Sequence, residues 1–324
     1  MSMPASGSLK IRTALEGPAR GFAFDVRAGL AKPQKELHSK YLYDELGSAL
    51  FEAITHLPEY GLTRADERLL ERHASEIARS IRRPASVIEL GSGVGQKTRH
   101  ILRAMSGVRY FPIDVSAEAL ARCEHELADV AEVYPLQQLY LEGMASAVAH
   151  RRPGETLLVL FLGSTIGNFE RPCAIEFLRD LRQCLERGDM LLIGADLIKD
   201  RERMLGAYDD PTGVTRAFNL NLLGRINREL GGDFDLRRFE HQARWNDPEG
   251  RIEMHLRSRT NQTVHIDAAD LTVSFHAGET IWTESSHKFH ASDMFGLAAQ
   301  ADFRVQSQWI DREWPFVESL WTAQ

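Results

Sequence analysis

Three glycines at alternate positions constrain this chain more than any other feature. Gly91, Gly93 and Gly95 follow an apolar run, and a stretch compatible with a helix comes next. A second apolar run ends at Asp114, nineteen residues after the last of these glycines. Glycine lets the backbone turn tightly and approach a ligand closely. The order of strand, glycine-rich turn, helix, strand and acid therefore predicts a ligand site at the carboxyl edge of a parallel sheet, where Asp114 accepts hydrogen bonds from ribose hydroxyls.

The spacing of these glycines indicates which adenosine cofactor binds. A dinucleotide-binding turn has the pattern Gly-x-Gly-x-x-Gly and brings a pyrophosphate to a helix N-terminus. Here the pattern is Gly-x-Gly-x-Gly, and Glu89 stands two residues before the first glycine. A carboxylate near the ligand suits a cation such as the sulfonium of S-adenosylmethionine (SAM), which we predict as the cofactor. The alternatives are an ordinary strand–helix turn and an NAD-dependent oxidoreductase; the glycine spacing and the lack of a clear acid–base set disfavour the latter.

Composition restricts the remaining classes of function. The 324 residues carry a net charge of −7 without a dense basic run, so we do not expect a nucleic-acid partner. Cys123, Cys173 and Cys184 lack a CxxC spacing and fit a reducing compartment. No run reaches the roughly 20 apolar residues that span a membrane, and residues 1–7 lack the apolar core of a signal peptide. The histidines show no metal-ligand spacing. We expect a cytoplasmic monomer with no membrane partner and no metal.

From residue 86 onward, apolar strands alternate with helical stretches. This alternation predicts right-handed crossovers and a mostly parallel, Rossmann-like sheet of the α/β class. The strands are expected at 86–90, 108–113, 137–141, 156–162 and 189–196. The helices are expected at 96–106, 117–130 and 171–186. A helix ending near Gln300 and two strands, 303–310 and 316–321, should complete the sheet with a terminal antiparallel hairpin.

The rest of the chain has a different pattern and predicts an inserted α+β substrate-binding domain. Strand-like runs separated by short turns between 237 and 276 are typical of antiparallel hairpins. Residues 1–20 are expected to form a loose tail, and residues 34–56 a helix. The expected SAM-binding domain comprises 64–199 and 287–324. The expected substrate-binding or lid domain comprises 20–63 and 200–286.

Several motifs beyond the glycine turn resemble one family, the histidine-specific SAM-dependent methyltransferases. The longest is Phe-Leu-Gly-Ser-Thr-Ile-Gly-Asn at 161–168. Other matching stretches lie at 41–51, 57–60, 63–64, 89–93, 207–210, 217–219, 225–230, 252–256 and 278–284. The resemblance implies a class I SAM methyltransferase fold. It also implies successive methylation of the α-amino group of L-histidine to give hercynine, a step of ergothioneine biosynthesis.

The resemblance also implies a role for individual side chains. Asn168 matches the residue that binds the α-amino group, and Tyr208 the residue that binds the carboxylate. Glu284 and Ser286 match the pair that holds the imidazole. The residues expected to surround the ring and the amine are Met254, Tyr43, Phe51 and Tyr60. For catalysis we expect Asn168 to orient the neutral amine, with Tyr43 or Tyr60 relaying its proton through water; the aromatic faces would meet the quaternary ammonium product.

The cofactor residues implied in the same way are Gly91, Gly93, Lys97 and Asp114, with Glu89 added from the spacing argument. Two departures from the family pattern stand out. The family often has Gly-Asp-Phe after the third strand, whereas this chain reads Glu-Gly-Met-Ala at 142–145. We therefore place Gly143 and Met144 at the cofactor, where Met144 cannot accept a bond from the adenine amino group. The second departure is a glycine at position 61, next to Tyr60.

Each of these residues also has a plainer interpretation. Asn168 could be a turn residue, Met254 ordinary core, Tyr208 a surface tyrosine and Glu284 a solvated strand residue. Two other functions stay open. One is an N-methyltransferase of another amino acid such as tryptophan, although an indole pocket would not need the Glu284 carboxylate. The other is a degenerate methyltransferase that binds SAM only as a sensor.

Overall fold

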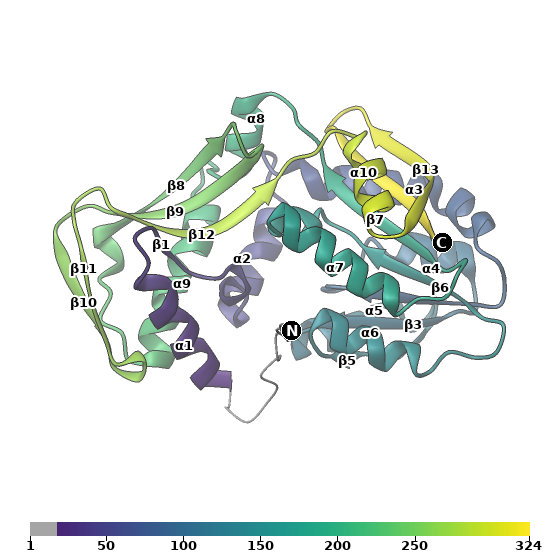
Figure 1. Ribbon diagram of the computed structural model, residues 1–324, viewed down its shortest axis with the longest axis horizontal. Coiled ribbons are helices and arrows are strands. Elements are labelled where there is room, and N and C mark those ends of the chain that lie inside the picture. The colour runs from purple at the N-terminus through teal and green to yellow at the C-terminus, as the bar shows by residue number, and fades with distance from the viewer. Residues whose placement is uncertain (1–17) are drawn as a thin grey trace, which may run out of the picture.

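A computed structural model describes residues 18–324 as an α/β protein with two main sheets (Figure 1). The larger sheet has eight strands in the order β13-β14-β7-β6-β2-β3-β4, with β5 also paired to β3. These strands are β2 (Ala85–Leu90), β3 (Arg109–Asp114), β4 (Glu132–Val133), β5 (Leu136–Gln137), β6 (Thr156–Phe161), β7 (Met190–Asp196), β13 (Phe303–Asp311) and β14 (Phe316–Ala323). The pairs from β4 to β7 are parallel, whereas β14 is antiparallel to β7 and to β13. The predicted α/β class with a terminal antiparallel hairpin is confirmed.

Helices cover both faces of this sheet, which is why its central strands are continuously apolar. Side chains alternate along β6: Leu158 and Leu160 belong to one core, and Leu157, Val159 and Phe161 to the other. The first core includes residues of α3 (Gly61–Ser80), α4 (Arg99–Met105) and α5 (Ala117–Leu127). The second includes residues of α6 (Tyr140–Val148), α7 (Arg171–Gln183) and α10 (Asp293–Gln300).

The second sheet joins the N-terminal part of the described chain to the segment that follows β7. Its four strands have the order β1-β12-β9-β8: β1 (Lys35–Glu36), β8 (Phe239–Asn246), β9 (Arg251–Ser258) and β12 (Thr280–His287). A separate hairpin consists of β10 (Gln262–Ile266) and β11 (Leu271–Phe275). The helices α1 (Pro18–Leu30), α2 (Glu45–Thr55) and α9 (Val214–Leu230) gather on one side of this second sheet in Figure 1. The domain boundaries given above stay a prediction.

The N-terminal segment departs from its predicted structure. Residues 34–56 form β1, the short helix η1 (Ser39–Leu42) and α2 in place of one helix. The break comes at Asp44, whose carboxylate caps α2 by accepting from the Gly47 N–H at 2.7 Å and also accepts from Asn221 of α9 at 2.7 Å. Of the predicted tail, 1–17 lies outside the described residues and 18–20 belongs to α1. None of the helices between 18 and 324 is long and apolar enough to cross a membrane.

The predicted strand at 137–141 is wrong. The strand β5 ends at Gln137, and α6 begins at Tyr140. Tyr140 favours a strand by type, whereas Leu139 and Leu141 are compatible with a helix, and the buried face of the helix decides the outcome. A Cβ at position 143 would lie 2.5 Å from the Ile113 side chain, so Gly143 lets α6 pack closely on β3. The residues that follow the strand are therefore 138 and 139, and not 142–145.

Candidate active site

The glycine turn and Asp114 form one hydrogen-bonded unit at the carboxyl edge of the large sheet. Gly91, Gly93 and Gly95 have φ of 73°, 51° and 72°, a conformation that favours glycine. The Gly93 N–H donates to Asp114 Oδ2 at 2.9 Å, and the Ser116 N–H donates to Oδ1 at 3.0 Å. A Cβ on Gly93 would meet no atom within 4 Å. The turn thus has an open side, and the Asp114 carboxylate retains acceptor sites for a ligand.

Glu89 does not face this open side. Its carboxylate is buried and accepts from the Thr98 hydroxyl at 2.7 and 2.8 Å, and from the Tyr110 hydroxyl. Burial raises the pKa of Glu89 to about 7, although these two donors oppose the shift. The carboxylate therefore supports the floor of the turn from inside the core. The predicted role of Glu89 at the cofactor stays a prediction.

Lys97 connects the turn to its neighbours through an acid that the sequence did not indicate. Its ammonium pairs with Asp66 of α3, which is fully buried. Asp66 also accepts from the Gly163 N–H at 3.0 Å, just beyond the end of β6. Glu318 of β14 lies close to this pair, and burial together with the Asp66 carboxylate holds the pKa of Glu318 well above its usual range. Asp66 therefore connects the segments that follow β2 and β6, because it contacts both Lys97 and Gly163.

The structure places Gly143 and Met144 on a helix, with Gly143 against Ile113, the residue before Asp114. Both lie inside α6, and Met144 is fully buried in the apolar core. The carboxyl edge next to Asp114 is instead formed by the residues after β5. The Gln138 N–H donates to the Asp114 carbonyl at 3.2 Å, and the Leu139 side chain is 60% exposed. Leu139, and not Met144, therefore follows the strand at this edge, because β5 ends at Gln137 and α6 begins at Tyr140.

Five aromatic rings from separate elements form a continuous cluster. Ring centroids are 5.4 Å apart for Tyr43 and Phe51, 6.3 Å for Phe51 and Tyr60, and 6.2 Å for Tyr60 and Tyr208. Phe218 of α9 lies 5.5 Å from Tyr43 and 5.9 Å from Phe51. The structure therefore brings together all four aromatics predicted for the substrate site. Phe218 adds a fifth ring; it lies in the matching stretch 217–219, to which we assigned no role in the site.

A β-bulge in β12 determines which side chains face this cluster. Trp282 pairs with His255 of β9, but Glu284 pairs with Met254, so Thr283 is the extra residue. The Thr283 hydroxyl lies 2.7 Å from Asn219 Oδ1 and 3.0 Å from the Met254 carbonyl oxygen. Paired residues of neighbouring strands share a face. Glu284 and Met254 therefore lie on the face toward the aromatic cluster.

Glu284 is the acid beside this cluster, where the substrate pocket is predicted. No group among residues 18–324 donates a hydrogen bond to its carboxylate. Burial raises the pKa of Glu284 to about 7, with the cation of Lys288 opposing the shift. Burial, with Glu284 adding to it, also holds the pKa values of Tyr43 and Tyr60 well above the usual range, so both hydroxyls stay protonated. The pocket thus holds a carboxylate with free acceptor sites amid neutral tyrosines.

A buried lysine stands behind the other polar groups of the pocket. Lys288 Nζ donates at 2.9 Å to the Tyr208 hydroxyl and at 2.9 Å to Ser286 Oγ, and it pairs with Asp196 at 2.9 Å. The Tyr208 hydroxyl donates to Ser286 Oγ at 2.7 Å. Lys199 pairs with the second oxygen of Asp196 at 2.6 Å. The sequence gave no sign of Lys288, because its partners come from distant parts of the chain.

Asn168 lies beside the same end of β12. It ends the short helix η2 (Thr165–Asn168), which packs against β12; a Cβ on Gly167 would lie 2.8 Å from the His287 carbonyl oxygen. The side chain of Asn168 is half-buried and has no hydrogen-bond partner in the described chain. Two residues later, Glu170 accepts from Arg251 at 2.6 and 2.7 Å. The loop that carries Asn168 is thereby fixed to the second sheet.

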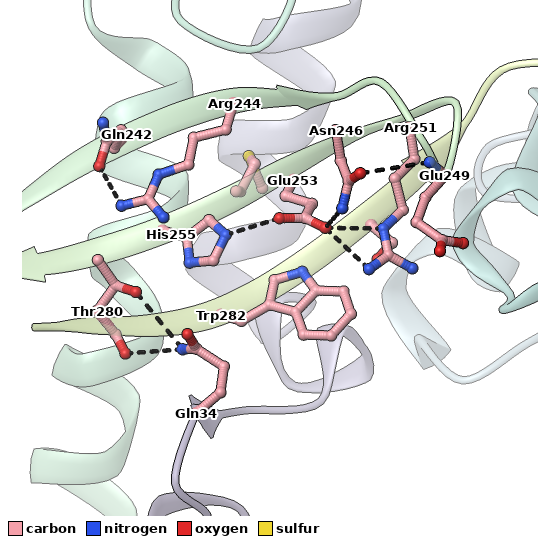
Figure 2. A network of polar contacts seen from close by, with 12 residues as sticks. Gln34, Gln242, Arg244, Asn246, Glu249, Arg251, Glu253, His255, Thr280 and Trp282 are labelled. Atoms are coloured by element: carbon pink, nitrogen blue, oxygen red, sulfur yellow. Dashed lines mark hydrogen bonds and ion pairs between the residues drawn. The ribbon is translucent and has the colours of Figure 1, made fainter.

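The opposite face of the second sheet holds a polar network that anchors Arg251 (Figure 2). Glu253 accepts from Arg251 and from Asn246 at 2.8 Å each, and lies 3.1 Å from His255 Nε2. The Arg251 guanidinium lies 4.5 Å from the Trp282 ring centroid. Across residues 18–324, no group of three His, Cys, Asp or Glu side chains could hold a metal ion. His255 lies within hydrogen-bonding distance of Glu253 and stacks on Trp282.

Comparison with known proteins identifies the family. Residues 22–323 match the family described as histidine-specific methyltransferase, SAM-dependent. The chain belongs to this family. It is 42% identical to histidine N-alpha-methyltransferase of Mycolicibacterium smegmatis, over 97% of this chain and 98% of that one. It is 42% identical to the protein of the same name of Mycobacterium tuberculosis, over 91% and 93%. It is 32% identical to ergothioneine biosynthesis protein 1 of Neurospora crassa, over 84% of this chain and 34% of that one.

Family membership confirms several predictions at once. The class I SAM methyltransferase fold, the activity class and SAM as the cofactor follow from it, and an NAD-dependent oxidoreductase is excluded. The open side of the turn at Gly93 and the free acceptor sites of Asp114 fit an adenosine cofactor. The roles of individual site residues stay predictions.

Proposed function

We propose that this enzyme methylates the α-amino group of L-histidine three times and releases hercynine, as a step of ergothioneine biosynthesis. The observation that carries the proposal is the pocket around Glu284. Its carboxylate has no partner among the described residues, faces the same way as Met254 and lies beside Ser286. A carboxylate and a hydroxyl side by side suit a ring that presents one nitrogen as donor and the other as acceptor. Imidazole is such a ring.

The cofactor edge would hold SAM through the residues of the glycine turn. When bound, SAM supplies an electrophilic methyl group on a sulfonium. Asp114 would accept from the ribose hydroxyls, with Gly93 allowing close approach and Lys97 held nearby by Asp66. Val115 and Leu139, which are 53% and 60% exposed at adjacent strand ends, offer apolar surface for the adenine. These assignments replace the one given to Met144.

The substrate amine must lose its proton before each transfer. Asn168 has an unengaged side chain beside β12, so its carbonyl can accept from an amine N–H and leave the lone pair free to attack. Tyr43 and Tyr60 are neutral and can relay the departing proton to water. The rings of Phe51 and Phe218 would meet the trimethylated cation by their faces.

Identification of the products by mass spectrometry tests this proposal. The protein is incubated with SAM and each common amino acid in turn. Trimethylated histidine alone is the expected product. Methylated tryptophan would overturn the pocket assignment, since an indole offers no acceptor nitrogen to Ser286; no methylation in any sample would favour a SAM-binding sensor.

Two further proposals concern the state of the enzyme. We propose that it acts as a monomer and in the cytoplasm. Cys123, Cys173 and Cys184 are all free thiols, which agrees with a reducing compartment. Light scattering of the purified protein would test the first point, and fractionation of cells the second.

A further inference from the structure

One buried amide side chain is bonded to three strands of the second sheet. Asn219 lies on α9 and is 0% exposed. Its Oδ1 accepts from the Thr283 hydroxyl of β12 at 2.7 Å, and its Nδ2 donates at 3.2 Å to the carbonyl oxygen of His255, which follows Met254 on β9. Nδ2 also lies 2.9 Å from His241 Nδ1 of β8. Asn219 thus joins α9 to β8, β9 and β12.

The hydrogen bonds of this group have one consistent direction. His241 Nε2 lies 2.7 Å from the Tyr208 carbonyl oxygen, which can only accept, so Nε2 carries the proton. Burial lowers the pKa of His241, so its ring is neutral near pH 7 and its Nδ1 is an acceptor. The two N–H groups of Asn219 are therefore used by His241 and by the His255 carbonyl. The amide is engaged within the protein at both ends and, being buried, reaches a ligand only through its partners.

The bond to Thr283 affects where the Glu284 side chain lies. Thr283 is the extra residue of the bulge and directly precedes Glu284. A bulged residue is left unpaired in the ladder, so its position depends on side-chain bonds such as the one to Asn219. The Trp282 indole N–H donates to the Glu284 carbonyl at 3.0 Å and secures the backbone just after the bulge. The carboxylate, which receives no hydrogen bond from residues 18–324, is therefore positioned through its backbone.

We propose that Asn219 and Thr283 are positioning residues that hold the Glu284 carboxylate in the one place from which it binds the ring of the substrate. This inference rests on the proposed function, because it takes the ring to be the imidazole of histidine. The same amide secures the backbone at Tyr208 and next to Met254, so the three predicted substrate side chains keep a fixed separation. A ring held in this way presents the amine to the methyl group in one orientation.

The test uses a matched pair of substitutions at Thr283. Thr283→Val removes the hydroxyl and keeps the branched shape of the side chain, whereas Thr283→Ser keeps the hydroxyl. Asn219→Leu removes the amide at similar size. Steady-state kinetics measures kcat and KM for L-histidine, while melting temperature and S-adenosylhomocysteine affinity report on folding. Ser86→Ala is the control, because it removes another buried hydroxyl, which donates to Glu155 at 2.6 Å at the amino end of β2.

We expect Thr283→Val to lower kcat/KM for histidine about tenfold, the order expected when a buried hydrogen-bond partner is left unsatisfied. Most of this loss should appear as a higher KM, and S-adenosylhomocysteine affinity should not change. Thr283→Ser should stay within about twofold of wild type, because its hydroxyl restores the bond. Asn219→Leu should lose more than Thr283→Val, since it leaves groups on three strands unpaired. Ser86→Ala should lower the melting temperature and leave kcat/KM unchanged.

A double-mutant cycle distinguishes positioning of Glu284 from a general loosening of the protein. In the Glu284→Gln background, Thr283→Val should cost less than about threefold in kcat/KM, because the group through which it acts is already lost. An undiminished loss in that background, an unaltered kcat/KM in Thr283→Val, or an equal loss in Ser86→Ala would overturn the positioning role. If Asn219→Leu does not fold, the Thr283 pair decides by the same criteria. Wild-type enzyme that neither binds nor methylates histidine would instead overturn the proposed function.

Discussion

The cofactor edge and the substrate pocket each contain a glutamate with a raised pKa, and the two carboxylates differ in what surrounds them. Burial raises the pKa of both Glu89 and Glu284 to about 7. Hydroxyls of Thr98 and Tyr110 donate to Glu89. Glu284 receives no hydrogen bond from any residue between 18 and 324, and the nearest cation bonds to other groups. The Glu89 carboxylate is thus satisfied by donors of the protein, whereas the Glu284 carboxylate has free acceptor sites.

A raised pKa therefore shows that a carboxyl group is shielded from water, but it does not show whether that group supports the fold or binds a ligand. The donors around the acid reveal it, because a satisfied carboxylate has little left to offer a substrate. Sequence reasoning placed both glutamates at ligands. In the structure, Glu284 keeps free acceptor sites, whereas Glu89 accepts from donors inside the core, under the turn; both placements at a ligand stay predictions.

The largest effect is expected at Glu284. Glu284→Gln keeps the size of the side chain but removes the anion that would pair with the ring N–H, so kcat/KM for histidine should fall about a hundredfold or more. S-adenosylhomocysteine affinity, measured by calorimetry, should stay nearly unchanged. An unaltered rate on histidine would remove Glu284 from the substrate site and erase the contrast with Glu89.

A smaller effect is expected at Asp114. Asp114→Ala removes the acceptor of the Gly93 and Ser116 N–H groups together with the predicted ribose contacts, so affinity for S-adenosylhomocysteine should fall about tenfold or more. Asp114→Asn retains one acceptor oxygen and should lose less. Calorimetry on both variants checks this order, and equal affinity in wild type and Asp114→Ala would place the ribose elsewhere.

The pH dependence of histidine affinity should include the ionisation of the Glu284 carboxyl group. Its carboxylate must be ionised to accept the ring N–H, and its pKa is raised to about 7, so affinity should rise as pH increases from below to above 7. Below the pKa the contribution of one group is at most about tenfold per pH unit. In Glu284→Gln, only the pH dependence that comes from the imidazole ring of histidine itself should remain. Titration calorimetry at several pH values measures both curves, and identical curves would contradict the assignment.

The smallest effect is expected at Glu89. SAM carries a sulfonium cation and S-adenosylhomocysteine does not, so a carboxylate close to the sulfur would favour SAM. Because the Glu89 carboxylate faces Thr98 and Tyr110 inside the core, Glu89→Gln should leave the ratio of the two affinities within about twofold of wild type. A selective loss of SAM affinity would show that Glu89 acts on the cofactor directly.

The sequence predicted those parts of the fold in which one kind of local signal dominates. The apolar runs of β6 and β7 reveal strands covered on both faces, and the strand–helix alternation reveals the parallel sheet. It failed at 138–141, where a short apolar run was interpreted as a strand, whereas α6 begins at Tyr140 and packs Gly143 against Ile113 of β3. It also missed β1, since two residues carry no periodic pattern.

The same limit applies to the site. Motif resemblance indicated Tyr43, Phe51, Tyr60 and Tyr208, and the structure brings these rings together. Nothing local indicated Lys288, because a lysine beside a histidine looks solvated until the fold brings it to Tyr208, 80 residues earlier in the chain. Hydrogen-bond donors of Glu89 were equally hidden. Such partners depend on tertiary contacts that no short segment encodes.

The bulge at Thr283 carries a consequence for how such a pocket can change in evolution. Beyond it, side chains alternate, so Glu284 and Ser286 share one phase of β12, while Ser285 and His287 share the other. Loss of Thr283 itself would leave Trp282 opposite His255 and Glu284 opposite Met254 in a regular ladder, so both sets would keep their faces. Loss of one residue after the bulge would instead move every later side chain of the strand to the opposite face. The bulge is thus a point on this strand at which a deletion leaves the order of the facing side chains in place.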